Sequence, residues 1–130
     1  QVLTGGKAHA LGGNFFEPTV LSDVHADMAL VTDEIFGPVA PLIAFDSEDE
    51  VIFAANNTIY GLAAYLYSEN LSRIMRVSRQ LEYGMVGINT SAISNEVVPF
   101  GGVKQSGLGR EGSKYGIEDF METKYLCIAV

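Results

Sequence analysis

The stretch that organises the chain spans residues 99–116 and reads PFGGVKQSGLGREGSKYG. It holds six of the chain's fourteen glycines. Glycine weakens a helix or strand by roughly 0.5–1 kcal/mol per position, so such a run is typical of a tight turn or a close approach to a ligand. A flexible surface loop is the competing interpretation. Phe100, between Pro99 and Gly101, argues against it, because a solvated linker has little use for an aromatic side chain there.

Part of this run, residues 107–112, matches the dinucleotide-binding pattern G-x-G-x-x-G. The pattern binds a pyrophosphate only where a strand leads into it and a helix follows. The preceding residues, Lys104-Gln105-Ser106, are polar and do not resemble a buried strand. No second strand ending in an acidic residue follows at the right distance. We therefore reject the match.

The composition indicates one globular domain or a part of one. An apolar share of 48% and a charged share of 18% favour a packed core over disorder. The formal net charge of −8 disfavours nucleic acid and anionic membranes as partners. No apolar run approaches the ~20 residues of a membrane span. His9 and His25 are isolated and lack metal-ligand spacing, so we expect no metal site.

A single cysteine, Cys127, excludes an internal disulfide and suits a reducing compartment, so we expect a cytoplasmic protein. Cys127 lies in a strand-like run without a nearby base, which favours a buried structural thiol over a nucleophile. The chain begins at Gln1 without a methionine, which indicates a fragment of a larger protein.

The middle of the chain alternates apolar strands with helical patterns. Ser47 and Glu50 form a capping box that opens a helix, and Asn70 caps a second one with an apolar stripe. Strand, helix, strand, helix, strand predicts an α/β fold with a parallel βαβαβ sheet. The expected strands are 42–45, 62–67 and 85–88, and the expected helices are 48–57 and the segment from residue 71 toward Gly84.

The loop that leaves the third expected strand at Asn89 leads to the Gly-rich run. Ligands of parallel sheets bind outside the carboxyl ends of the strands, so the topology predicts that the run lies at that edge. Residues 113–122 follow with a helical pattern. Residues 123–130 read as a strand that needs a partner, either another subunit or upstream chain.

Several motifs resemble one enzyme superfamily over nearly the whole chain. Four segments resemble the C-terminal third of the aldehyde dehydrogenase superfamily. They are Glu34-Ile35-Phe36-Gly37-Pro38, Tyr60-Gly61-Leu62, Gly87-Ile88-Asn89 and residues 99–107. Residues 93–97 and 109–119 look most like succinate-semialdehyde dehydrogenase. Residues 90–92 depart from that pattern, which has a glycine near position 91. The resemblance implies the C-terminal part of a catalytic domain (1–122), followed by an oligomerisation strand (123–130).

The resemblance also implies a chemistry, the oxidation of an aldehyde to an acid with NAD or NADP. In this superfamily a cysteine thiolate attacks the carbonyl and a glutamate activates water. Neither group is expected in this chain, so we expect no catalytic residue here and no activity from the 130 residues alone. The enzyme is expected to be a homo-oligomer with a small aldehyde as substrate.

Four residues match binding positions of the superfamily. Glu34 matches the acid that accepts hydrogen bonds from the nicotinamide ribose, and Phe36 matches the aromatic beside the nicotinamide. Phe100 matches a substrate-pocket aromatic, and Ser94 matches a residue that holds the substrate's distal carboxylate. The competing roles are a surface acid in a turn for Glu34, core filling for both phenylalanines, and a local turn hydrogen bond for Ser94.

Three functions therefore stay open at this point. The first is the cofactor- and substrate-facing part of a succinate-semialdehyde dehydrogenase. The second is a dehydrogenase for another aldehyde, such as glutarate semialdehyde or a neutral aldehyde. The third is a non-catalytic interaction module left by truncation.

Overall fold

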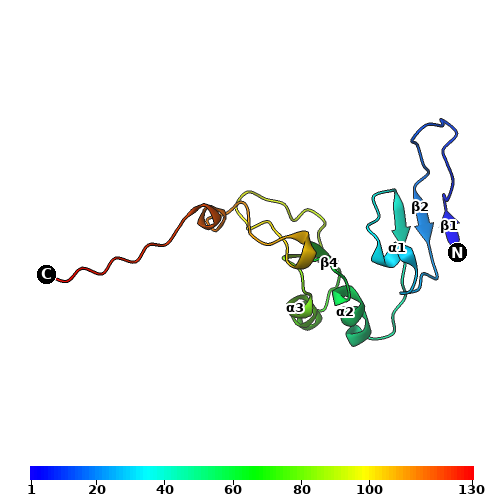
Figure 1. The fold of residues 1–130 in the computed structure, drawn as a ribbon. Coiled ribbons are helices and arrows are strands. Elements are labelled where there is room, and N and C mark those ends of the chain that lie inside the picture. Colours follow the sequence, from blue (N-terminus) through cyan, green and yellow to red (C-terminus); the bar gives the residue numbers. More distant parts are fainter. The chain divides into compact units, whose positions relative to one another are not determined.

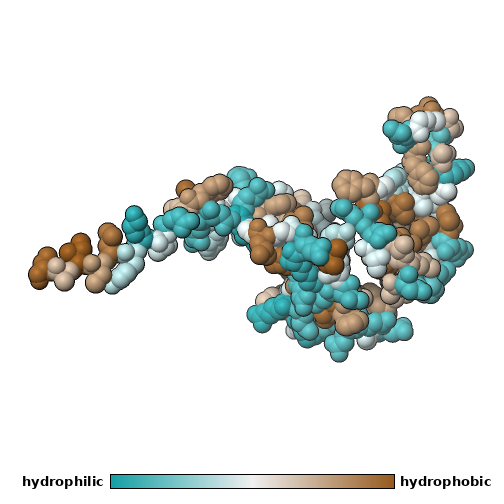
Figure 2. All heavy atoms as spheres, in the orientation of Figure 1, coloured by the Kyte–Doolittle hydropathy of each residue, from teal (hydrophilic) through white to brown (hydrophobic).

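A computed structural model describes residues 1–130, which divide into two compact units, residues 1–54 and residues 55–130 (Figure 1). None of its helices is long and apolar enough to cross a membrane. Few apolar side chains are buried within the chain by itself. The buried ones are Val24 and Ile52 in the first unit and Ile74 and Val77 in the second. Figure 2 shows apolar side chains on the surface, including the C-terminal residues.

The first unit is built on a three-stranded sheet in the order β1 (Val2–Thr4), β2 (Thr19–Leu21) and β3 (Val39–Pro41). β1 runs antiparallel to β2, and β2 runs parallel to β3. The buried hydroxyl of Thr19 accepts a hydrogen bond from the Gly6 amide at 2.8 Å and donates to the Glu17 carbonyl at 2.8 Å. This side chain therefore ties the start of β2 to the loop that connects β1 and β2.

The remaining parts of the first unit are short. Helix α1 (Ala29–Thr32) precedes β3, and α2 (Glu48–Asn56) follows it and ends in the second unit. Ser47 accepts a hydrogen bond from the Glu50 amide at 3.2 Å, while the Glu50 carboxylate accepts one from the Asp46 amide at 2.9 Å. The predicted capping box is confirmed at Ser47, and its return bond reaches one residue further upstream than in the standard motif.

The second unit contains a parallel pair of strands, β4 (Ala63–Leu66) and β5 (Met85–Ile88), joined by α3 (Leu71–Gln80). The Asn70 side chain accepts a hydrogen bond from the Arg73 amide at 2.9 Å, which confirms the predicted N-cap. The pairing of β4 and β5 across a helix confirms one βαβ unit of the predicted fold.

The first strand of the βαβαβ prediction is misplaced. The strand expected at 42–45 lies at Val39–Pro41 and pairs in parallel with β2 of the same unit. The Thr19 amide donates to the Pro38 carbonyl and the Leu42 amide to the Leu21 carbonyl, both at 2.8 Å, so the ladder with β2 continues past both ends of β3. The apolar pattern marks where extended chain is favourable, but it does not specify which strand becomes the neighbour.

The predicted helix at 113–122 is replaced by a short 3-10 turn, η2 (Gly116–Phe120). Gly112 and Ser113 both have positive φ angles, +67° and +53°, which interrupt a right-handed helix at its first turn. Residues 123–130 form neither helix nor strand and have no pairing partner within the chain (Figure 1). An oligomerisation strand at these positions stays a prediction.

Candidate functional site

The Gly-rich run lies at the amino ends of β4 and β5, not at their carboxyl ends. The Gly61 carbonyl, just before β4, accepts a hydrogen bond from the Val103 amide at 3.0 Å. The Ser106 hydroxyl accepts one from the Gly61 amide at 2.9 Å. Gly84, just before β5, lies so close to the run that an added Cβ would collide with the Gly101 carbonyl oxygen. The predicted location of the run is therefore wrong.

The loop between Asn89 and the run explains this position, because it crosses the face of β5. An added Cβ at the buried Gly87 would lie 2.8 Å from the Ile93 side chain and 2.8 Å from the Thr90 carbonyl oxygen. The start of the loop is held at the carboxyl end of the strands. There the Asn89 side chain accepts from the Ser68 amide at 2.8 Å and donates to the Ser68 carbonyl at 2.9 Å.

Two of the predicted site residues, Ser94 and Phe100, line the same cavity of about 290 Å³ in the second unit. The other residues that line it are Leu62, Ala63, Tyr65, Met85, Ser91, Ala92 and Ile93. Ser94 is exposed, and its hydroxyl makes no hydrogen bond within the chain. The turn after it is held by Asn95, whose side chain accepts from the Val97 amide at 3.0 Å. The hydroxyl of Ser94 thus remains available to a ligand.

Phe100 and Leu62 also line a second cavity, of about 480 Å³. The second cavity is formed by residues of the Gly-rich run together with Leu62, Asp119 and Phe120. Phe100 exchanges backbone hydrogen bonds of 2.9 and 2.8 Å with Glu111, which fixes its backbone. Its side chain is half-buried.

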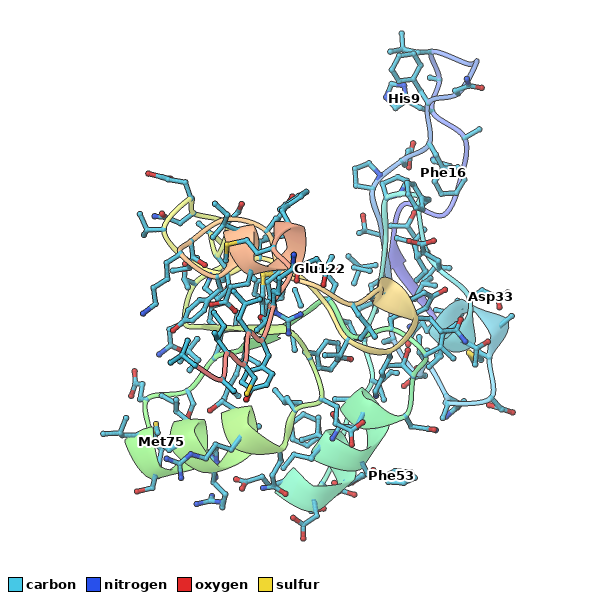
Figure 3. The ribbon with its side chains drawn as sticks, turned by 60° about the vertical axis from the view of Figure 1, so that its left-hand side comes forward. His9, Phe16, Asp33, Phe53, Met75 and Glu122 are labelled. Carbon is cyan, nitrogen blue, oxygen red and sulfur yellow. The ribbon has the colours of Figure 1, made fainter.

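The other two predicted residues, Glu34 and Phe36, lie in the first unit, in the extended segment between α1 and β3. The Glu34 carboxylate is exposed and takes part in no hydrogen bond or ion pair within the chain. Phe36 is 91% exposed, so it fills no core of this chain. Figure 3 labels the neighbouring Asp33, at the end of α1.

Two charged residues of the run, Lys104 and Arg110, have structural partners. Lys104 forms an ion pair with Glu82, with 2.8 Å between Nζ and Oε2. Arg110 donates from Nη1 to the carbonyl oxygens of Gly102 and Gly109, both at 2.7 Å. These contacts give both side chains a structural role.

His9, the acidic side chains and Cys127 are the other residues that could bind a metal or react. His9, at the far end of the loop between β1 and β2 (Figure 3), accepts a hydrogen bond from the Leu11 amide at 3.2 Å. No group of three or more histidine, cysteine, aspartate or glutamate side chains is arranged to hold a metal ion. Cys127 is exposed, so the expectation of a buried thiol is wrong for this chain. The reason is that residues 123–130 have no partner here.

Comparison with known proteins places the chain among dehydrogenases. The profile described as "Aldehyde dehydrogenase family" matches residues 1–126. The chain is 62% identical over 128 residues to the 3-sulfolactaldehyde dehydrogenase of Pseudomonas putida and to the glutarate-semialdehyde dehydrogenase of Pseudomonas aeruginosa. Each match covers 98% of this chain and 26% of the relative. The chain therefore spans about a quarter of the length of the curated relatives it matches.

A solved structure shows the same fold. The crystal structure of succinate-semialdehyde dehydrogenase from Burkholderia pseudomallei superimposes with a TM-score of 0.94 at 64% sequence identity. The match covers 100% of this chain and 27% of that one.

The close approach of the run to Gly84 generates a prediction about stability. In the intact protein that contains this chain, Gly84→Ala should lower the free energy of unfolding by about 1–3 kcal/mol, because the new methyl group meets backbone that has no room to yield. Chemical denaturation measures this change. Gly37→Ala is the matched control, since an added Cβ there meets nothing within 4 Å. Equal effects of the two substitutions would contradict the packing argument.

Proposed function

Because the chain belongs to the aldehyde dehydrogenase family, we propose that it is the C-terminal part of an NAD(P)-dependent enzyme that oxidises succinate semialdehyde to succinate. The observation that carries the proposal is the cavity shared by Ser94 and Phe100, with an unpaired hydroxyl beside apolar walls. Such a cavity suits a short aliphatic aldehyde with a polar group at its far end.

The role of Ser94 in this proposal is to donate a hydrogen bond to the distal carboxylate of the substrate. The free hydroxyl supports this role over a local turn bond, because Asn95 already supplies the side-chain hydrogen bond of the turn. Phe100 would pack against the aliphatic part of the substrate. The nucleophile and the general base would come from outside this chain.

The cofactor is NAD or NADP. Among the relatives, one is named as NADP(+)-dependent and another has been solved as an NAD+ complex. The chain offers a hydrogen-bond acceptor and an aromatic ring that fit a nicotinamide riboside. Glu34 is a free carboxylate that can accept from two ribose hydroxyls, and Phe36 presents an exposed aromatic ring. The cofactor, when bound, would supply the acceptor for the hydride of the aldehyde.

A second candidate substrate comes from the relatives named above. At the same 62% identity these are named for 3-sulfolactaldehyde and glutarate semialdehyde, which share an acidic group at the far end with succinate semialdehyde. Succinate semialdehyde differs from these two aldehydes in the length of its chain or in the nature of its acidic group. In the cell we place the enzyme in the cytoplasm as a homo-oligomer with the strand 123–130 at its interface.

The experiment that tests the function follows cofactor reduction by the full-length enzyme. The substrates are succinate semialdehyde, glutarate semialdehyde, 3-sulfolactaldehyde and a neutral aldehyde of similar length, each with NAD and with NADP. We expect the highest kcat/KM with succinate semialdehyde. A preference for another acidic aldehyde would reject the proposed substrate and keep the chemistry. No turnover with any substrate would favour a non-catalytic module.

The proposed role of Ser94 makes a specific prediction for the full-length enzyme. Ser94→Ala should lower kcat/KM for succinate semialdehyde about tenfold or more, because a hydrogen bond to a charged group contributes ~1.5–3 kcal/mol. A neutral aldehyde should be affected little. Ser91→Ala, which removes another hydroxyl from the same cavity, is the matched control. Equal losses on acidic and neutral aldehydes would rule out a carboxylate contact.

The proposed role of Glu34 predicts an effect on the cofactor. Glu34→Gln should raise the KM for NAD(P) about fivefold or slow hydride transfer, because the amide accepts hydrogen bonds through one oxygen only and carries no charge. Steady-state and single-turnover kinetics measure both quantities. Asp33→Asn neutralises the adjacent exposed acid and is the control. If both variants behave like the wild type, Glu34 is a surface acid in a turn.

A further inference from the structure

Lys104 is the most connected side chain of the Gly-rich run. Its Nζ donates hydrogen bonds to the carbonyl oxygen of Asn56 at 2.7 Å and to that of Thr58 at 3.3 Å. The same atom lies 2.8 Å from the Glu82 carboxylate. An ammonium group has three N–H donors, and here all three have acceptors. The Lys104 side chain is 24% exposed, whereas that of Glu82 is 60% exposed, so solvent screens the ion pair more than the carbonyl contacts.

The three acceptors belong to two segments that are distant from Lys104 in the sequence. Asn56 is the last residue of α2, where carbonyl oxygens lack partners inside the helix and carry partial negative charge. Glu82 follows α3 and leads into β5. A lysine is well suited to this place, because its positive charge complements both the helix end and the carboxylate. Lys104 thus joins the run to the segments before β4 and before β5.

The backbone at Lys104 adopts a conformation that favours glycine. Its φ angle is +56°, in the left-handed region that non-glycine residues rarely occupy. A non-glycine residue keeps this conformation only when the surrounding contacts stabilise it enough to outweigh its own backbone preference. The ammonium contacts supply part of this constraint, together with the backbone hydrogen bonds of Val103 to Gly61 and of Gln105 to Ile59, both at 3.0 Å.

The position of Lys104 is transmitted to Phe100 through backbone that has little freedom. Gly102 is buried, and its carbonyl oxygen accepts from Arg110 at 2.7 Å. Gly101 is confined between Gly84 and the Gly109 carbonyl oxygen. The Val103 amide donates to the Gly61 carbonyl at 3.0 Å, so this bond and the Lys104 contacts together set the position of residues 101–103. Phe100 is the next residue upstream, and it lines the cavity that contains Ser94.

We propose that Lys104 is a positioning residue for the aldehyde. Its ammonium group holds residues 101–104 against the helix end, and this places the Phe100 ring at the wall of the substrate cavity. The inference rests on the proposed function, since it assumes that Phe100 contacts the substrate. Lys104 itself lines neither of the two cavities.

The test is a double-mutant cycle in the full-length enzyme with Lys104→Met and Phe100→Ala. Lys104→Met keeps much of the aliphatic length but removes the donors. It should raise the KM for the aldehyde about fivefold or more, because small displacements of a wall residue weaken substrate positioning. The KM for NAD(P) should stay within about twofold of the wild type. In the Phe100→Ala background, Lys104→Met should have almost no further effect on the aldehyde KM, since the two residues act through one contact.

The control is Tyr83→Phe. The Tyr83 hydroxyl donates to the Ala55 carbonyl at 2.7 Å, so its loss removes a bond from the same end of α2 without touching the run. The aldehyde KM of this variant should stay within about twofold of the wild type, as expected when only local stability changes. If Tyr83→Phe raises it as much as Lys104→Met does, or if Lys104→Met keeps its full effect in the Phe100→Ala background, the positioning role is overturned.

Two features keep the test independent of protein folding and of the proposed substrate. If Lys104→Met does not yield folded enzyme, Lys104→Gln replaces it in the same cycle. The amide can still donate to a carbonyl of the helix end but forms no ion pair with Glu82, so the rise in the aldehyde KM should be smaller and should again disappear in the Phe100→Ala background. The cycle is measured with whichever aldehyde the wild-type enzyme turns over best. A different preferred aldehyde would thus contradict the proposed substrate, while the coupling of Lys104 to Phe100 would still be decided by the cycle.

Discussion

Direct contact between backbone segments, with no side chain in between, is the constraint on which the second unit depends. Residues 101–103 cross the chain at Gly61 and Gly84, the positions just before β4 and β5. A side chain at either glycine would occupy the space of a carbonyl or of Val103. The glycines are therefore needed for close approach, and the hydrogen bonds between Val103, Ser106 and Gly61 become possible only because of it.

This contact organises the candidate substrate site. The run must reach the amino ends of the strands, so the loop that begins at Asn89 has to return across β5. That return brings Ser94 and Phe100 to one cavity and leaves the hydroxyl of Ser94 without a partner. The charged side chains of the run contribute by binding carbonyl oxygens. Arg110 supplies a donor to the Gly102 carbonyl, and Lys104 adds a second hydrogen bond to the Asn56 carbonyl, which also accepts from the Thr58 amide at 2.9 Å.

Local features of the fold were predictable because their causes lie within a few residues. The caps at Ser47 and Asn70 mark the starts of α2 and α3, and both are observed as side-chain hydrogen bonds. The parallel pair β4 and β5 follows from the strand–helix–strand pattern. The membership in a family of dehydrogenases was also readable from short motifs. The grouping of Ser94 with Phe100 was expected from that resemblance, and the structure places both side chains at one cavity.

Other features depended on contacts between distant residues. The sequence by itself determined the helix starts, the apolar strands, the need for glycine at certain positions and the residues available for binding, because these follow from short-range preferences and side-chain chemistry. Only the tertiary structure decided that β3 pairs with β2, that the run lies at the amino ends of β4 and β5, and that Lys104 binds the end of α2. The physical reason is that many pairings satisfy the same local preferences, and the choice among them is made by packing and hydrogen bonds across the fold.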